Sequence, residues 1–490
     1  MKRAAALLAL ALAGCTAHAP ARGSASAVET SVERLSCEEG RAEAQGRSVE
    51  VHPEFTLAFV EFDDQGRFWD RRQLELLEQT LDAEEARSGG LIVGVFAHGW
   101  HHDGSLCDQN VACFRTFLTQ IAHDTQAITR ASGGRVTSRR VVGIFVGWRG
   151  RSGTLHPFSD LTFWARKRVA HKIGSGDLIE LLTRVDLAVK RMNAVPHDTA
   201  EIASAKAPAT RSADRLVDGN RARLVIIGHS FGGTMVYDAL ANILKSRVVE
   251  ALVRERERPG QAVIEGFGDL VVLVNPAFEA ARYRSLYELS HSFRRFAPRQ
   301  GPVLVIIASE TDGPNQTWFP LGRLIETAWE RTAHPDDKRA LRTSVGNYDD
   351  FVDYRLEAAV EDAGRRRLGG GDLRGVARRR TEHSSRCACE LALEDVGEEE
   401  LPEVARRVAA LEDPAADAHL PARACGAPMR YGRAELTCSP STDLRNPFWV
   451  VRASDDVVHG HSGFFTNAYV DFVRGVVLEA VSQKRLPEAG

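Results

Sequence analysis

One short stretch constrains the fold of this chain more than any other. Residues 224–233 read Leu-Val-Ile-Ile-Gly-His-Ser-Phe-Gly-Gly, so an apolar run leads directly into the pattern Gly-x-Ser-x-Gly. A helical pattern follows, and the stretch therefore predicts a strand, a sharp turn and a helix, which is the arrangement of a nucleophile elbow. In such a turn the backbone of Ser230 is strained and its hydroxyl is exposed. Glycine is expected at 228 and 232 because a Cβ would collide as the strand and the helix approach each other.

Apolar strands alternate with helical sequence along most of the chain. Strands are predicted at 55–62, 91–97, 141–146, 224–227, 270–274, 303–308 and 448–451. Helical patterns occupy 71–87, 111–128, 161–192 (with a break at 174–176), the stretch after Ser230, and 468–481. Strands that are apolar on both faces and alternate with helices predict an α/β fold, with a mostly parallel central sheet and helices on both faces.

This alternation stops between residues 329 and 446. An arginine-rich run (365–380), an acidic run (394–403) and most of the late cysteines fall there. We expect a core formed by 48–328 and 447–490, with 329–446 as a late insertion or cap, and we expect both charge runs to be solvated surface. Residues 196–220, rich in Ala, Ser, Thr and charge, are expected to form a loop.

Composition narrows the class of protein. The 490 residues are 43% hydrophobic and 26% charged, with a net charge of -3, which is ordinary for a globular protein and argues against a nucleic-acid partner. After the first residues, no apolar run is long enough to span a bilayer.

The N-terminus has the pattern of an export signal. Lys2 and Arg3 precede an apolar run from Ala4 to Ala13, which predicts a signal peptide over 1–14. The run ends in Leu-Ala-Gly-Cys, which resembles the bacterial lipobox. This resemblance implies lipidation of Cys15, a tether over 15–47, and a lipid-anchored protein of the bacterial cell envelope, on the periplasmic side or the outer membrane. An ordinary signal peptide with a chance cysteine is the alternative.

Export would place the other seven cysteines in an oxidising compartment, where disulfides are favoured over metal ligation. Cys107 and Cys113 are close enough in sequence to close a small loop. The late cysteines 387, 389, 425 and 438 are expected to staple their segment, and zinc is the alternative for them, although their spacing matches zinc sites poorly.

Acidic residues and histidines follow two of the predicted strands. Glu310 and Asp312 come after the strand at 303–308, and His459 and His461 come after the strand at 448–451. In open parallel sheets reactive groups gather at the carboxyl ends of strands. A serine nucleophile needs a base to accept its proton and an acid to orient that base, and these residues supply both.

The elbow, the His-Gly at 98–99 and the order Ser230, Asp312, His461 resemble the α/β-hydrolase superfamily of serine esterases and lipases. The resemblance covers residues 55–481 except 329–446. It implies that Ser230 is the nucleophile, Asp312 the acid and His461 the general base. In that superfamily the acid follows the second strand after the elbow strand, and the histidine follows the next one. Glu310 is the alternative acid and His459 the alternative base.

The resemblance also implies an oxyanion hole formed by the backbone N–H groups of Trp100 and Phe231, with a structural role for His98. No cofactor is implied, and His101 and His102 lack the spacing of a metal site. The expected function is hydrolysis of a carboxylic ester, from a small molecule or a lipid, through an acyl-enzyme. Thioesterase, amidase or acyltransferase chemistry would use the same site, and a non-catalytic envelope binding protein with a hydrolase fold is the alternative from another class.

Overall fold

The structure is a computed structural model of the 490-residue chain. It describes residues 19–24, 28–29, 47–88, 90–131, 139–150, 163–194, 222–293, 296–297, 300–327, 330–332, 335–359, 425, 428–439 and 442–482. The predicted signal peptide, Cys15, Cys37, the loop at 196–220, both charge runs, Cys387 and Cys389 lie outside the described residues.

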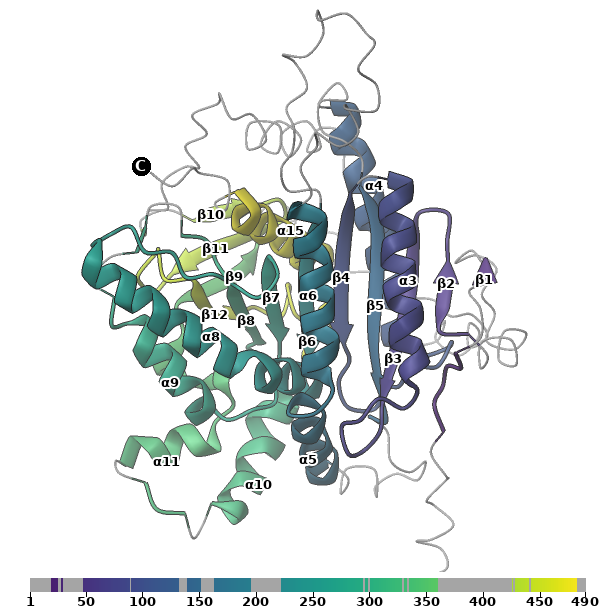
Figure 1. The fold of residues 1–490 in the computed structure, drawn as a ribbon. Helices are drawn as coiled ribbons and strands as arrows, with labels where there is room; N and C mark the ends of the chain where they lie inside the picture. Colours follow the sequence, from purple (N-terminus) through teal and green to yellow (C-terminus); the bar gives the residue numbers. More distant parts are fainter. Residues whose placement is uncertain are drawn as a thin grey trace, which may run out of the picture.

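One sheet of twelve strands runs through the described part of the chain (Figure 1). In spatial order its strands are β1 (Val28–Glu29), β2 (Val49–Val51), β3 (Phe55–Phe62), β5 (Arg140–Trp148), β4 (Leu91–Ala97), β6 (Ala222–His229), β7 (Leu270–Val274), β8 (Leu304–Ser309), β12 (Phe448–Ala453), β9 (Tyr354–Ala358), β11 (Ala434–Cys438) and β10 (Met429–Tyr431). Every neighbouring pair from β3 to β9 is parallel, whereas β2 with β3, β9 with β11, and β11 with β10 are antiparallel. The predicted mostly parallel sheet is therefore confirmed.

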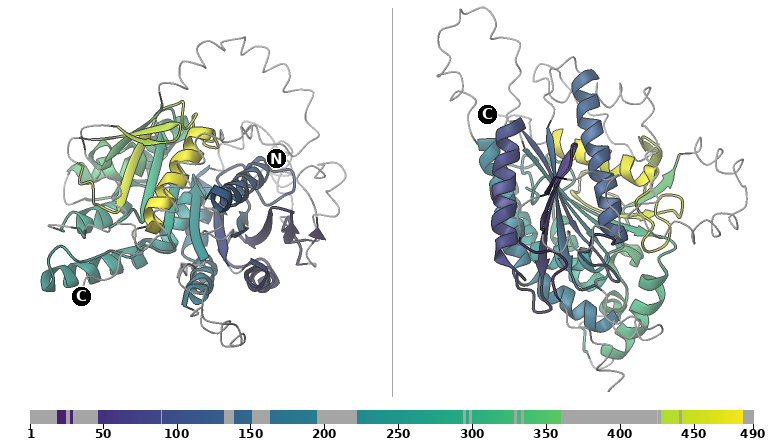
Figure 2. Two further views of the ribbon diagram at one scale, coloured as in Figure 1. Left: turned by 90° about the horizontal axis from the view of Figure 1, so that it is seen from above. Right: turned by 90° about the vertical axis from the view of Figure 1, so that its right-hand side faces the viewer.

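Helices cover both faces of this sheet (Figures 1 and 2). One face is covered by α3 (Arg71–Ser88), α5 (Phe163–Gly174), α6 (Leu178–Ala194), α8 (Phe231–Glu257) and α9 (Ala280–Ser290). The other is covered by α4 (Gln109–Ala131) and α15 (Asn467–Ser482). The short elements η4 (Pro314–Trp318), α10 (Phe319–Glu326), α11 (Pro335–Arg342), η5 (Val345–Asn347) and η6 (Asp349–Phe351) follow β8. The predicted α/β class is confirmed.

The apolar runs become strands because both of their faces are buried. In β6, Leu224 and Ile226 pack toward α8, whereas Val225 and Ile227 belong to the core on the side of α4 and α15. Successive side chains of a strand point to opposite faces, so a strand between two helical layers must be apolar at every position. This is why an unbroken apolar run leads up to the serine.

The late segment contributes more to the sheet than its sequence indicated. Strands β9, β11 and β10 lie within 329–446 and extend the sheet beyond β12. A disulfide joins Cys425 to Cys438, the last residue of β11, and Cys107 and Cys113 are also disulfide-bonded. The described parts of 329–446 thus include strands of the central sheet.

Asp353 links the residues before β9 to β12 through a buried carboxyl group. Its N–H donates to the carbonyl oxygen of Val450, and its Oδ2 accepts from the N–H of Val450, both at 2.9 Å. Burial raises the pKa of Asp353 to about 7. An unfolded aspartate has a pKa of about 3.9, so between about pH 4 and pH 7 the folded chain holds a proton that the unfolded chain has lost. The free energy of unfolding therefore falls as the pH rises through this range.

Asp353→Asn is expected to remove this pH-dependent loss, because an amide stays neutral. Between pH 4 and pH 8, the free energy of unfolding of the variant relative to that of the wild type should rise by about 4 kcal/mol. Urea unfolding of both proteins at the two pH values measures the change. Glu75→Gln, which alters an exposed carboxylate on α3, serves as the control and should show no such rise. A stability difference for Asp353→Asn that is equal at both pH values would contradict the prediction.

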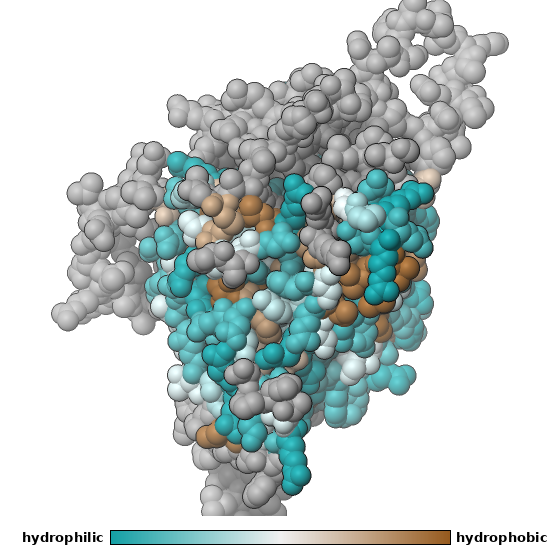
Figure 3. All heavy atoms as spheres, turned by 90° about the vertical axis from the view of Figure 1, so that its left-hand side faces the viewer, coloured by the Kyte–Doolittle hydropathy of each residue, from teal (hydrophilic) through white to brown (hydrophobic). Residues whose placement is uncertain are grey.

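The face that carries α8, α9 and α11 is mainly hydrophilic, with smaller apolar patches (Figure 3). Val249 and Val253 of α8 are among the exposed large apolar side chains of the described residues. Among the described residues, no helix has both the length and the apolar character required to cross a bilayer.

Candidate active site

Ser230 occupies a strained turn between β6 and α8. Its backbone has φ 55° and ψ -117°, in a region that non-glycine residues rarely adopt. A Cβ on Gly228 would lie 2.8 Å from the Cα of Gly233 in α8, so the expected clash of strand and helix is present. The reason for Gly232 differs from the expectation, because a Cβ there would overlap the carbonyl oxygen of Ala97 at the end of neighbouring β4. The two glycines therefore allow two different close approaches.

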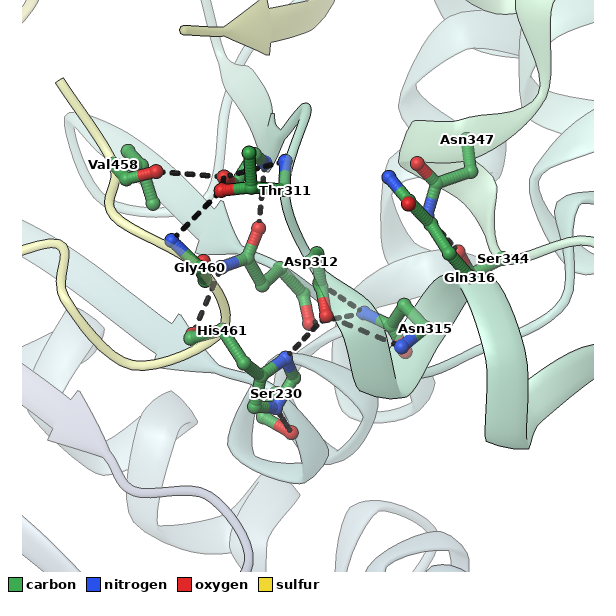
Figure 4. A network of polar contacts seen from close by, with 12 residues as sticks. Ser230, Thr311, Asp312, Asn315, Gln316, Ser344, Asn347, Val458, Gly460 and His461 are labelled. Carbon is green, nitrogen blue, oxygen red and sulfur yellow. Dashed lines mark hydrogen bonds and ion pairs between the residues drawn. The ribbon is translucent and has the colours of Figure 1, made fainter. Parts of the chain in front are cut away.

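A continuous chain of hydrogen bonds joins the serine, the histidine and the aspartate that the sequence singled out (Figure 4). His461 Nε2 lies 2.7 Å from Ser230 Oγ, and His461 Nδ1 lies 2.8 Å from Asp312 Oδ1. Because a carboxylate only accepts, Nδ1 carries the proton and Nε2 is left to accept from the serine hydroxyl. An imidazole held in this tautomer can take the serine proton and generate a nucleophile.

Asp312 is fully buried and its orientation is set by one neighbour. The Asn315 N–H donates to Asp312 Oδ1 at 3.1 Å, and Asn315 Nδ2 donates to Oδ2 at 2.8 Å. Asn315 Nδ2 also donates to the carbonyl oxygen of Asn275 at 2.9 Å. The carboxylate therefore keeps the rotamer that faces His461.

The two alternative residues lie elsewhere. Glu310 pairs with Arg355 at 2.8 Å, and both side chains are substantially exposed. His459 pairs with Asp455 at 2.7 Å, and its side chain is 80% exposed. The structure thus brings Asp312 and His461 to Ser230, while Glu310 makes a surface ion pair and His459 a surface hydrogen bond.

Two further side chains, which sequence reasoning did not single out, hold the histidine loop in place. Asn275 Nδ2 donates to the carbonyl oxygens of Gly460 (3.1 Å) and His461 (2.8 Å), and its Oδ1 accepts from the Ser309 N–H at 2.8 Å. His229 Nε2 donates to the same carbonyl of His461 at 2.8 Å. Asn275 has a positive φ of 45° and is fully buried after β7. Asn275 therefore links β8, the strand that precedes Asp312, to the loop that contains His461.

Asn275→Asp is expected to lower kcat for a p-nitrophenyl ester about 10- to 100-fold with little change in KM. The carboxylate cannot donate to the two loop carbonyls. The His461 ring would therefore no longer be held at hydrogen-bonding distance from the Ser230 hydroxyl. Steady-state kinetics and a thermal melt measure the effect.

Asn347→Asp is the matched control for that variant. Asn347 donates to Ser344 Oγ at 2.9 Å in η5 and makes no described contact with the three residues. Asn347 is half-buried, and its variant should leave kcat within about twofold because it lies away from the site. A folded Asn275→Asp protein with unchanged kcat would show that the loop does not depend on these bonds.

His98 supports the loop that follows β4. The Trp148 N–H donates to His98 Nε2 at 3.2 Å, so Nδ1 carries the proton and donates to the Gly99 carbonyl at 2.9 Å. Trp148 Nε1 donates to the His98 carbonyl at 3.0 Å. Burial lowers the pKa of His98 to about 4, so the ring is neutral at neutral pH. These contacts fit the structural role expected for it.

The loop after β4 lies directly against the serine. A Cβ on Gly99 would be 2.8 Å from the Cβ of Ser230, which places the next residue, Trp100, close to that serine. Phe231 begins α8, and the N–H groups of the first turn of a helix have no partner within the helix. Among the described residues, neither the Trp100 N–H nor the Phe231 N–H donates a hydrogen bond. Both are thus available to a negatively charged oxygen at Ser230.

Aromatic side chains gather beside these two N–H groups. Phe163 of α5 packs against Phe231 at 4.9 Å and edge-on against Trp100 at 5.3 Å between ring centroids. Burial lowers the pKa of His229 well below its usual value, with nearby His461 adding to the effect. Apolar side chains therefore lie beside the serine, and the neutral ring of His229 packs against the ring of His461.

Comparisons of this chain with models of protein families, with curated proteins and with solved structures found no match. The chemistry of the site therefore has to be argued from its own geometry.

Proposed function

We propose that this chain is a serine hydrolase with an α/β-hydrolase fold, and that it cleaves carboxylic esters through an acyl-enzyme. The observation that carries the proposal is the continuous hydrogen-bonded chain from Asp312 through His461 to the strained Ser230. The order of the strands supports it, because the acid follows the second strand after β6 and the histidine follows the next strand of the parallel sheet.

In the proposed reaction, Ser230 Oγ attacks the ester carbonyl carbon while His461 Nε2 accepts the hydroxyl proton. Asp312 stabilises the resulting imidazolium, and the N–H groups of Trp100 and Phe231 donate to the oxyanion. Collapse of the tetrahedral intermediate breaks the bond to the alcohol, which leaves with the proton from His461. Water, activated by the same imidazole, then releases the acid and restores the serine.

The proposed setting is the bacterial cell envelope, with a lipid anchor at Cys15. This part of the proposal rests on the Leu-Ala-Gly-Cys pattern and on the apolar run before it. Attached acyl chains bind a bilayer through about 0.8 kcal/mol per buried CH₂, so more than one chain gives stable anchoring.

The direct test is reaction of the purified protein with a fluorophosphonate probe, together with a panel of p-nitrophenyl esters, thioesters and anilides. Labelling with ester turnover supports the proposal. Preference for a thioester or an anilide would assign a related chemistry to the same residues, and absence of both labelling and turnover would indicate a binding protein.

A further inference from the structure

Part of the expected tether is built into the folded body. Arg22 is 1% exposed, and its guanidinium donates to Glu50 at 2.9 Å and to the Gly104 carbonyl at 2.8 Å. The backbone N–H groups of Ala21 and Arg22 donate to the two carboxylate oxygens of Glu61, at 2.9 and 2.8 Å. Residues 19–24, which we call the docked segment, are therefore fixed to the body by side-chain and main-chain bonds.

The partners of the docked segment are themselves buried and shared. Glu50 also accepts two hydrogen bonds from Arg115, at 2.9 and 2.7 Å, and Gln73 Nε2 donates to the Arg22 carbonyl at 2.8 Å. Release of Arg22 would remove one of the two guanidinium partners of a buried carboxylate, which is unfavourable. The segment therefore stays attached while the protein is folded.

The docked segment lies at the end of the sheet where the parallel strands terminate, which is also the end that carries the serine. Glu61 is near the carboxyl end of β3 and Gly104 follows β4, and both strands are parallel to β6, whose carboxyl end leads to Ser230. Gly104 belongs to the same loop as Gly99, which touches Ser230. Figure 1 shows the docked segment as a purple coil beside the carboxyl ends of β3 and β5.

The distance from this segment to the lipid-anchor position is short. Three residues separate Cys15 from Ala19, so the connection spans at most about 14 Å when fully extended. The 18-residue helix α3 runs from the carboxyl ends of the strands back toward their amino ends and is about 27 Å long. An anchor at Cys15 could not place the amino ends of the strands on a bilayer while the segment is docked.

We infer that the docked segment holds the Ser230 end of the sheet, where the parallel strands terminate, against a lipid bilayer. The enzyme would then draw its ester substrate from the membrane surface. This inference rests on the proposed hydrolase and on lipidation of Cys15, and it narrows the substrate class to esters presented by lipids or by acylated envelope molecules.

The orientation can be measured without any catalysis. Lipidated protein would be placed on vesicles of phosphatidylethanolamine and phosphatidylglycerol that contain a lipid-bound quencher. A fluorescent amino acid would replace either Arg67, which is 74% exposed in the turn after β3, or Arg87, which is 65% exposed at the far end of α3. Severalfold stronger quenching at 67 than at 87 is expected. Equal quenching, or stronger quenching at 87, would overturn the inference.

The role of the short connection is tested with a flexible Gly/Ser linker of about 20 residues, whose ends lie about 25 Å apart on average. Inserted between His18 and Ala19, it should abolish the difference in quenching. It should also lower hydrolysis of a long-chain 4-methylumbelliferyl ester in the vesicles severalfold, with hydrolysis of water-soluble p-nitrophenyl acetate unchanged. The same linker between Gly40 and Arg41, beyond the docked segment, is the matched control and should change neither readout.

The possible failures are distinguishable. If the protein hydrolyses p-nitrophenyl acetate but the linker leaves vesicle hydrolysis and quenching unchanged, the inference is wrong and the proposed hydrolase stands. If Cys15→Ser protein binds the vesicles as well as the wild type does, the anchor assumed here is wrong and the inference falls with it. If neither ester is hydrolysed, the proposed hydrolase fails, and the quenching difference alone decides the orientation.

Discussion

Ser230→Ala is expected to lower kcat/KM for a p-nitrophenyl ester by at least about 10⁴-fold and to abolish labelling by a fluorophosphonate. In the proposed reaction the change removes the atom that forms the acyl-enzyme, whereas the proposed oxyanion donors and the imidazole remain. Such sites keep a small residual catalysis from the oxyanion hole and from binding alone. Alanine has the same backbone restrictions as serine, so the strained turn at φ 55° is not relieved or worsened. The melting temperature should therefore stay close to that of the wild type.

The measurements for this variant are ester kinetics, gel fluorescence after labelling, and a thermal melt. Ser175→Ala is the matched control, because Ser175 lies in the exposed connection between α5 and α6. That variant should label and turn over like the wild type. Labelling that survives in Ser230→Ala would place the nucleophile at another residue.

Asp312→Asn is expected to lower kcat about 10³- to 10⁴-fold while the protein stays folded. An asparagine can donate its NH₂ to His461 Nδ1, which moves the ring proton to Nε2, and a protonated Nε2 cannot accept the serine proton. The effect is large because the 2.8 Å contact between Asp312 and His461 sets the tautomer of the imidazole.

Glu310→Gln distinguishes the two candidate acids. Glu310 pairs with Arg355 on the surface, so its variant should keep kcat within about twofold. Rates measured for both variants with one ester, alongside circular dichroism, complete the comparison. A large loss in Glu310→Gln with none in Asp312→Asn would reverse the assignment of the acid.

The sequence was sufficient to predict the elements that build the site. The strand over 55–62 and the strand over 91–97 match β3 and β4, and the break at 174–176 separates α5 from α6. Buried parallel strands are easy to predict because they are apolar on both faces and bounded by turns. Because Ser230, Asp312 and His461 each follow such a strand, the sequence predicted that they lie together at the carboxyl ends of the strands.

The strands of the late segment could not be found in the same way. β9 has one buried face and one exposed face, with buried and exposed residues alternating over its first four positions, and β11 likewise alternates buried with half-buried residues at its start. More than 70 residues separate the two in sequence, although they pair in the sheet. The alternation in Tyr-Arg-Leu-Glu-Ala was a usable signal for a strand, but its partner could not be predicted because nothing local determines it.

The residues that hold the His461 loop in place were missed for a different reason. Asn275 looks like the start of a turn because Pro276 follows it, and His229 occupies a variable position of the Gly-x-Ser-x-Gly pattern. Their importance comes from hydrogen bonds to main-chain carbonyl groups more than 180 residues away in sequence. Such bonds follow from the assembled fold, so no local pattern reports them.

The two ends of the sheet bear on how copies of this protein behave when they are crowded together. A broad sheet offers a row of unpaired N–H and C=O groups at each edge, to which another chain can add as an extra strand. Here the outermost strands are β1, with two residues, and β10, with three. Edges this short provide few bonds for a neighbouring molecule. In the part of the chain that the structure describes, the short outermost strands therefore protect the molecule against strand-to-strand aggregation at high concentration.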